Sequence, residues 1–425
     1  MDEISKVIFV CDFGMRTSQR VSKLALMLRS RNIDVILIHH DQFPPEDPGL
    51  FTEIHEYCYL DQVLGIIKDL YPGNLFHVFS SWHLYVAYEL IKDKPGRIIF
   101  DNYDCLKGFI NDEFLDREYP HVLEAERFCL ENADALCCRN METQYLKRQF
   151  NYKFRFKRLY MPDGCSSSKT RNESSRAHHK GGYVFAGGML SGKMDFFDNW
   201  HCQVGLHLSK AKLHYHIYPS NSISEEYKGR LADFINRYSE AAYFHIHEPL
   251  PYSDLMDELT EYKYGMYFVK VDKVVETPVR QFYGWGNKLY DYLEAGLLTI
   301  SDSPQGAFMS WIIRRYKMGR IVNGANDISF DAAEENNVEI PRIFTPEFNG
   351  PRLVDFYREV MEHDYEMDEI YDAMLGADRR FARSISIIKK IFETERNNPE
   401  AMKALRLVLN EIKRPDLAEK LQKRV

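Results

Sequence analysis

The sequence predicts an α/β protein that contains two doubly wound, Rossmann-like parallel-sheet domains. The chain has 425 residues, which is too many for one ordinary hydrophobic core. Short apolar segments alternate with helical patterns in both halves of the chain. A polar stretch without apolar periodicity, residues 166–180, separates the two halves and is typical of a linker.

The first half begins with an apolar strand, residues 6–10. Val21, Leu24 and Leu28 then follow helical spacing, and a second strand is predicted at residues 34–38. Strand, helix and strand within about 30 residues form a βαβ unit, which requires a parallel sheet. Further strands are predicted at 75–79, 97–100 and 134–138, with helices at 82–92 and 120–131.

The second half repeats the alternation, and the end of the chain is helical. Strands are predicted at 183–186, 213–218, 242–246, 265–269 and 297–300. The predicted divisions are a first Rossmann-like domain at 1–165, a second Rossmann-like domain at 180–350, closing helices at 351–397 and a helical hairpin at 398–425. This hairpin resembles a single tetratricopeptide repeat, so we expect it to pack on the second domain or to mediate self-association.

Composition excludes some classes of function. A hydrophobic content of 45% with 28% charged residues is typical of a soluble globular protein. The net charge of -8 argues against non-specific nucleic-acid binding. Apolar runs fall short of the roughly 18 residues that span a membrane, and the N-terminus lacks signal-peptide features. The eight cysteines include no Cys-x-x-Cys pair, so we expect reduced thiols and a cytoplasmic location.

The most informative segment is residues 286–302, which predict a loop, a short helix, a glycine stop and a buried strand. Asn287 precedes Lys288, and Asp291 lies three residues further along the same helical face. The amides at the helix start and Lys288 can bind an anion, and Asp291 can accept hydrogen bonds from sugar hydroxyls. The alternative is an ordinary amphipathic helix whose Lys and Asp face solvent.

A glycine-rich loop follows the first strand of the second half. Gly187 and Gly188 lead to Lys193, in the spacing of a phosphate-binding loop. Met194 replaces the hydroxyl residue that would bind magnesium, which disfavours an ATPase. The glycine amides and Lys193 can still bind phosphate oxygens. The alternative is a glycine-rich turn with a surface lysine.

Polar residues also follow the strands of the first half. Gly14 and Arg16 lie in the first strand-to-helix turn, where a ligand can approach the backbone and a guanidinium can reach a phosphate or an acceptor. His83, Asp101 and Asp104 lie near carboxyl ends of predicted strands, so each is a candidate base or hydroxyl orienter. A role in packing, turns or helix capping is the alternative for all five.

Two histidine pairs and one basic segment remain open to more than one interpretation. His214 with His216, and His245 with His247, have the i, i+2 spacing of zinc ligands, but no cysteine or carboxylate set accompanies them. We therefore expect no metal.

Residues 147–158 interleave cations with aromatics. They predict a strand with one solvated face, or else a patch that meets a membrane surface or an anionic acceptor.

Together, these segments resemble GT-B nucleotide-sugar glycosyltransferases, close to the family 4 type that includes bacterial polysaccharide enzymes. The resemblance covers residues 6–395. It rests on the glycine turn at 13–16, Ile99–Asp104, Glu124–Asp134, Met161–Gly164, Phe185–Gly188 with Lys193, Pro249–Leu255, and Asn287–Gly296.

The resemblance implies that Lys193 and Lys288 bind the donor diphosphate and that Asp291 binds the ribose, where the family usually has Glu. It also implies a retaining, metal-independent transfer. Three positions depart from the family pattern. Tyr283 stands where a second acid is common, the first domain lacks the usual histidine after Ile99-Phe100, and Leu298 replaces a proline.

We therefore expect a cytoplasmic glycosyltransferase, with peripheral contact at the inner membrane face as an option. The donor would be a nucleoside-diphosphate sugar, with UDP or GDP expected, and the acceptor a glycan, a lipid-linked group or a protein. Two alternatives remain, a nucleotide-sugar epimerase of the same fold and a non-catalytic sugar- or partner-binding protein.

Overall fold

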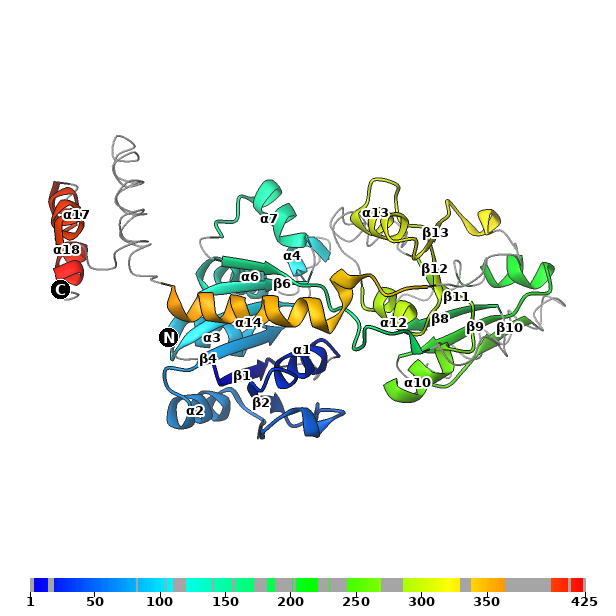
Figure 1. Cartoon of the computed structure of the whole chain (residues 1–425), viewed down its shortest axis with the longest axis horizontal. Helices are drawn as coiled ribbons and strands as arrows, with labels where there is room; N and C mark the ends of the chain where they lie inside the picture. Colours follow the sequence, from blue (N-terminus) through cyan, green and yellow to red (C-terminus); the bar gives the residue numbers. More distant parts are fainter. Residues whose placement is uncertain are drawn as a thin grey trace. The chain divides into compact units, whose positions relative to one another are not determined.

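The computed structural model describes residues 4–13, 19–81, 83–103, 105–109, 120–139, 141–154, 157–171, 182–187, 201, 204–220, 229, 243–268, 286–328, 338–363, 399–411 and 414–422. The chain divides into two compact units, Met1–Met361 and Glu362–Val425. The larger unit contains two parallel sheets (Figure 1).

The first sheet has seven strands in the order β3-β2-β1-β4-β5-β6-β7 among the described residues. All of its strand pairs are parallel. The order reverses between β1 and β4, and ligands in open α/β sheets bind outside the carboxyl ends of the strands at such a reversal. The strands are β1 (Lys6–Cys11), β2 (Asp34–His40), β3 (Glu53–Tyr57), β4 (Leu75–Ser80), β5 (Arg97–Asn102), β6 (Ala135–Cys138) and β7 (Lys157–Tyr160).

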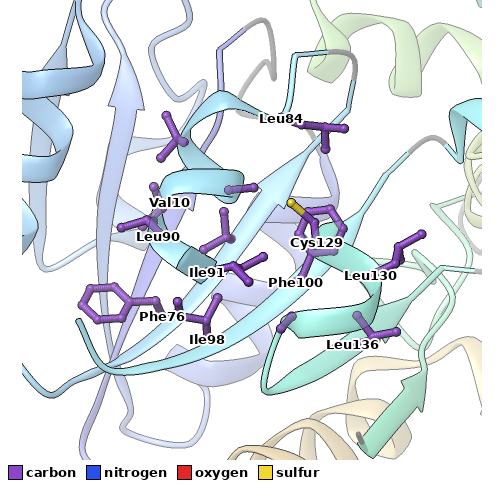
Figure 2. Close-up of a cluster of buried hydrophobic side chains, with 14 of the residues drawn as sticks. Val10, Phe76, Leu84, Leu90, Ile91, Ile98, Phe100, Cys129, Leu130 and Leu136 are labelled. Atoms are coloured by element: carbon purple, nitrogen blue, oxygen red, sulfur yellow. The ribbon is translucent and has the colours of Figure 1, made fainter. Parts of the chain in front are cut away.

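Both faces of this sheet are buried, as expected when helices cover a parallel sheet on two sides. Val10, Phe76 and Phe100 pack with residues of α3 and α6 on one face (Figure 2). Val7 and Phe9 pack on the other face with α1 and α14. The helices are α1 (Gln19–Arg29), α2 (Leu60–Leu70), α3 (Tyr85–Asp93), α4 (Leu106–Phe109), α6 (Pro120–Asn132), α7 (Glu142–Phe150) and α14 (Pro346–Glu362), with a 3-10 turn, η1 (Pro48–Leu50).

The second sheet has six described strands in the order β10-β9-β8-β11-β12-β13, with a reversal between β8 and β11. The prediction of two doubly wound domains is therefore confirmed. Its strands are β8 (Tyr183–Gly187), β9 (Tyr215–Pro219), β10 (Phe244–Ile246), β11 (Tyr264–Tyr267), β12 (Leu298–Ser301) and β13 (Gly319–Ile321). The helical elements are α10 (Tyr252–Leu259), α12 (Lys288–Glu294), α13 (Phe308–Arg315), η4 (Ala325–Asp327) and η5 (Arg342–Phe344).

The chain crosses between the two sheets twice, and the two crossings are hydrogen bonded. The amide of Cys165 donates to the carbonyl of Phe344 at 2.8 Å. After the second crossing, α14 returns to the first sheet and buries Leu353, Phe356 and Tyr357 beside β1. Helix α14 begins at Pro346, so the predicted division at residue 350 falls inside a helix.

The structure corrects the prediction for residues 147–158. Residues 147–150 belong to α7, and the strand β7 begins only at Lys157. Tyr152 is buried and Phe154 packs against the first core, so aromatic side chains of this segment face inward. The burial of residues 151–154 does alternate, but these residues form an irregular segment after α7 and not a strand.

The second unit contains α17 (Pro399–Glu411) and α18 (Pro415–Gln422) among its described residues. Leu405 and Leu409 are buried, as are Leu417 and Leu421, which gives the two helices a shared apolar contact. A role in self-association stays a prediction. Among the helices that the structure describes, none is both long enough and apolar enough to cross a membrane.

A fully buried arginine holds the first domain together. The Arg20 guanidinium on α1 donates to both Asp101 carboxylate oxygens at 2.8 and 3.1 Å, and to Asp163 at 2.7 Å. His77 contacts Asp101 at 3.2 Å through Nε2 and the Tyr357 hydroxyl at 2.5 Å through Nδ1. This Arg20 network therefore joins α1, β4, β5, α14 and the first crossing.

In the Arg20 network, the positive charge of the guanidinium stabilises the ionised form of the buried carboxylates. Burial alone would raise the pKa of Asp101, but the Arg20 charge and the His77 hydrogen bond hold it below its usual value. Burial lowers the pKa of His77, so its ring is neutral near pH 7. Arg20 is thus the cation that compensates both buried carboxylates.

We expect Arg20→Met to lower the free energy of unfolding by about 3–5 kcal/mol, because it leaves Asp101 and Asp163 buried without a cation. Arg29→Met is the matched control on the same helix, since the Arg29–Asp34 pair is more than one-third exposed on both sides. It should cost about 1 kcal/mol or less. Urea denaturation followed by circular dichroism measures both losses, and equal losses would contradict the prediction.

Candidate functional site

The candidate site lies at the carboxyl edge of the second sheet, where the strand order reverses. Gly187 ends β8 with φ +145°, a conformation that favours glycine. A Cβ atom at this position would overlap the Cε and Nζ atoms of Lys288. The fold therefore brings together a glycine and a lysine that the sequence places in two separate phosphate-binding segments.

The Lys288 ammonium lies near two aromatic rings. Its Nζ lies 5.1 Å from the ring centroid of Phe185 and 6.0 Å from that of Tyr267, within the range of cation–π attraction. Burial, followed by the Lys288 charge, lowers the pKa of His201 to about 3, so that ring is neutral. The Tyr267 hydroxyl accepts the Gly286 amide at 2.7 Å and so positions the loop before α12.

Asn287 connects this edge to the first domain. Its Nδ2 donates to the hydroxyl of Tyr103, which follows β5, at 2.6 Å. The Arg139 guanidinium lies 4.3 Å from the centroid of the same tyrosine ring and stacks on it. Because Tyr103 and Arg139 follow β5 and β6, this contact joins the carboxyl edges of both sheets.

Asp291 is held by protein groups in this conformation. Its Oδ1 accepts the Tyr252 hydroxyl of α10 at 2.9 Å and lies 3.7 Å from Nζ of Lys23 on α1. Lys23 also donates to the Gly164 carbonyl at 2.9 Å. Burial raises the pKa of Asp291, and Lys23 and Tyr252 offset this only in part. Binding of a ribose by Asp291 stays a prediction.

The two described first-domain candidates, His83 and Asp101, lie in different environments. Asp101 is fully buried in the Arg20 network, whereas His83 is exposed and its ring stacks on Tyr85. Burial gives Asp101 a structural role in this conformation, and its catalytic role stays a prediction. Six further positions lie outside the described residues: Gly14, Arg16, Asp104, Gly188, Lys193 and Tyr283.

Asp12 occupies the reversal point of the first sheet. Its carboxylate accepts the amides of Val86 and Ala87 at 3.0 and 3.1 Å, and the Ser80 hydroxyl at 3.0 Å. Burial raises its pKa despite these bonds. The N-terminus of α3 is thus satisfied by a carboxylate of the protein itself.

Glu126 stabilises the loop that follows β5. It is fully buried on α6 and accepts the amides of Leu106 and Lys107 at 2.5 and 3.1 Å, together with Nδ2 of Asn102 at 3.1 Å. Burial raises its pKa to about 7, although these hydrogen bonds act in the opposite direction. The start of α4 therefore depends on a carboxyl that titrates near neutral pH.

The sequence does not identify four residues beside this edge. Lys23 and Tyr252 contact Asp291, Tyr103 contacts Asn287, and Arg139 stacks on Tyr103. One signal was available for α1. Arg20 and Lys23 fall on the face that also carries Leu24, so two cations occupy core-facing helical positions. Such positions indicate buried partners elsewhere in the chain, although spacing alone does not identify them.

Comparison with known proteins places this geometry in a wider context. No family model matches the chain, and no curated protein matches it. Among solved structures, sucrose-phosphate synthase from Thermosynechococcus elongatus has a TM-score of 0.53 at 13% identity, covering 88% of this chain and 100% of that one. A glycosyltransferase from Rickettsia africae has a TM-score of 0.51 at 10% identity, covering 84% and 99%. The chain has a GT-B fold.

A third structural neighbour is named as an epimerase, which catalyses a different reaction. A UDP-GlcNAc 2-epimerase from Neisseria meningitidis, bound to UDP-GlcNAc, has a TM-score of 0.51 at 8% identity, covering 83% of this chain and 100% of that one. Structural similarity at identities this low establishes the fold and leaves the activity open. The resemblance drawn from the sequence is thus confirmed as a GT-B fold.

The buried Glu126 predicts a pH dependence of stability. Its pKa of about 7 lies above the roughly 4.3 of an unfolded chain, so between these values the folded chain holds a proton that the unfolded chain lacks. This carboxyl should therefore lower stability by roughly 2–4 kcal/mol as pH rises from 4 to 8. Glu126→Gln should flatten the decline in urea denaturation, and exposed Glu124→Gln is the control. The same slope in Glu126→Gln and the wild type would refute the assignment.

Gly187→Ala should distort the candidate site. Alanine is strained at the positive φ of Gly187, at a cost of about 1–3 kcal/mol, and its methyl group displaces the flexible end of Lys288. Gly65→Ala on α2 is the control, because a Cβ there meets nothing within 4 Å and alanine favours a helix. Denaturation curves compare the two variants. If Gly187→Ala is as stable as Gly65→Ala, the backbone conformation described for Gly187 does not exist in solution.

Proposed function

We propose that this GT-B protein is a glycosyltransferase that uses a nucleoside-diphosphate sugar as donor. The single observation that supports this most is the contact between Gly187 and Lys288 at the strand-order reversal of the second sheet. The location is where an open α/β sheet binds its ligand, and the two residues have the properties that a diphosphate requires.

The chemistry follows from charge and shape. Glycosyl transfer releases a nucleoside diphosphate, so negative charge develops on its phosphate oxygens in the transition state. The half-buried Lys288 ammonium interacts with that charge more strongly than one fully in water, because part of its surroundings is protein of lower dielectric constant. Gly187 has no side chain, which lets the phosphate approach both the backbone and Lys288.

The first domain would supply the acceptor side. The Asn287–Tyr103 hydrogen bond places the edge of the first sheet beside the proposed donor site. His83, which is exposed at the carboxyl end of β4, is the described candidate for a base or an acceptor-orienting group. Asp291 would have to exchange Tyr252 and Lys23 for ribose hydroxyls, which implies a movement of α1 relative to α12.

An epimerase is the second candidate, because a UDP-GlcNAc 2-epimerase matches the fold as well as a glycosyltransferase does. It would need an acid–base pair within one donor pocket and no acceptor. Incubating the protein with UDP-GlcNAc alone separates the two reactions. Formation of an epimer without an acceptor supports the epimerase, and transfer only when an acceptor is present supports the proposal.

Donor binding is tested by thermal shift with UDP-, GDP-, CMP- and dTDP-sugars. A ligand at about 100 times its dissociation constant stabilises the folded state by roughly 2.7 kcal/mol. We expect UDP- or GDP-sugars to shift the wild type. If none of the nucleotides shifts it, the donor site is refuted, together with both enzymatic candidates.

Lys288→Ala should abolish that shift and lower kcat of transfer or donor hydrolysis by about 10²–10³-fold, since it removes a charge that acts on the leaving group. Lys263→Ala is the matched control. The Lys263 ammonium also lies over a ring, 5.3 Å from that of Tyr264, but at the amino end of β11. Retained activity in Lys288→Ala would refute Lys288 as a ligand of the leaving diphosphate. A nucleotide shift in the wild type without transfer, hydrolysis or epimerisation would instead indicate a non-catalytic binding role.

A further inference from the structure

Four histidines share one face of the second sheet, on or directly beside strands β9 and β10. His216 on β9 pairs in parallel register with His245 on β10. Because side chains two residues apart in a strand point the same way, His214 and His247 lie on that same face. The sequence shows two separate i, i+2 pairs, and the fold combines them into one cluster.

The ring nitrogens of this histidine cluster converge. His214 Nδ1 lies 2.7 Å from His245 Nε2, and His216 Nδ1 lies 2.9 Å from His247 Nε2. One nitrogen from each of His214, His216 and His245 lies within 4.8 Å of the other two. Such close nitrogen pairs require at least one ring of each pair to present a lone pair.

Neighbouring groups orient these rings. His247 stacks on Tyr218, with ring centroids 4.2 Å apart, and the Tyr218 hydroxyl hydrogen-bonds to Glu258 of α10. Rings that are held in place by their neighbours are already oriented for metal binding.

We propose that His214, His216 and His245 bind a first-row divalent transition metal, best represented by Zn²⁺, with His247 or water as the fourth ligand. Imidazole nitrogens suit this class of ion, and three histidines with one further ligand complete a tetrahedral site. Zn–N bonds of about 2.0–2.1 Å place the nitrogens roughly 3.3 Å apart. The His214–His245 pair, now at 2.7 Å, would therefore open slightly, and the nitrogens that lie up to 4.8 Å apart would close.

A metal at this position would link β9 to the edge strand β10, which otherwise pairs over a short length. The site is distinct from the proposed donor chemistry, for which no metal is expected. A second group of potential ligands, His77, Asp101 and Cys137, does not qualify. The Arg20 guanidinium already binds Asp101 and the Cys137 sulfur, so a cation of the protein occupies that position.

Isothermal titration with Zn²⁺ on the full-length, tag-free protein, after EDTA treatment and buffer exchange, tests the proposal. We expect one Zn²⁺ per chain with micromolar or tighter affinity, and a melting temperature that rises with Zn²⁺. Co²⁺ should give the intense visible absorption of a tetrahedral site, which identifies the coordination geometry independently of affinity.

His216→Gln/His245→Gln should weaken Zn²⁺ binding at least tenfold and remove the Co²⁺ band. His83→Gln/His121→Gln removes two exposed imidazoles elsewhere and should leave both unchanged. His214→Gln, at the exposed end of the cluster, repeats the test with less risk to folding. Equal Zn²⁺ binding by the control and the cluster variants, or no binding by the wild type, would overturn the proposal.

Discussion

The fully buried cation Arg20 sets the geometry on which the rest of the first domain depends. Its guanidinium neutralises Asp101 in the sheet and Asp163 in the first crossing, and His77 extends the network to Tyr357 on α14. Desolvating three charges is unfavourable unless their geometry is maintained, so the network specifies one arrangement of helix, sheet and crossing. That arrangement in turn fixes the position of Lys23, one turn further along α1, beside Asp291.

The proposed donor edge therefore depends on residues from both domains. Lys288 lies against Gly187 of the second sheet. Asn287, which precedes it, and Asp291, three residues after it, contact Tyr103 and Lys23 of the first domain. Residues 287–291 would therefore bind the donor, and their contacts would also depend on the position of the first domain. Polar contacts of this kind can be exchanged for ligand contacts at little net cost, because each is replaced by a comparable hydrogen bond.

The sequence predicts the fold well, because buried parallel strands read as apolar runs and glycine turns mark their ends. It also identifies Gly187 and Lys288 as candidate phosphate ligands, and the structure brings these two together. It does not show which distant groups surround a residue. Asp101 has the sequence signature of a strand-end catalytic acid, a role that stays a prediction, and spacing along the chain does not reveal its contacts with Arg20 and His77. The edge strand β3, Glu-Ile-His-Glu-Tyr, has too few apolar residues to be recognised, because it owes its place to pairing with β2.

The return of α14 to the first sheet means that the first domain is discontinuous in sequence. Leu353, Phe356 and Tyr357 cover a face of that sheet which residues 1–165 alone would leave open to water. During synthesis, this face of the first domain therefore stays uncovered until nearly two hundred further residues have left the ribosome. Folding of the two domains is consequently coupled in time, and the segment most exposed to chaperones and proteases is the unfinished first sheet rather than the later-made second one.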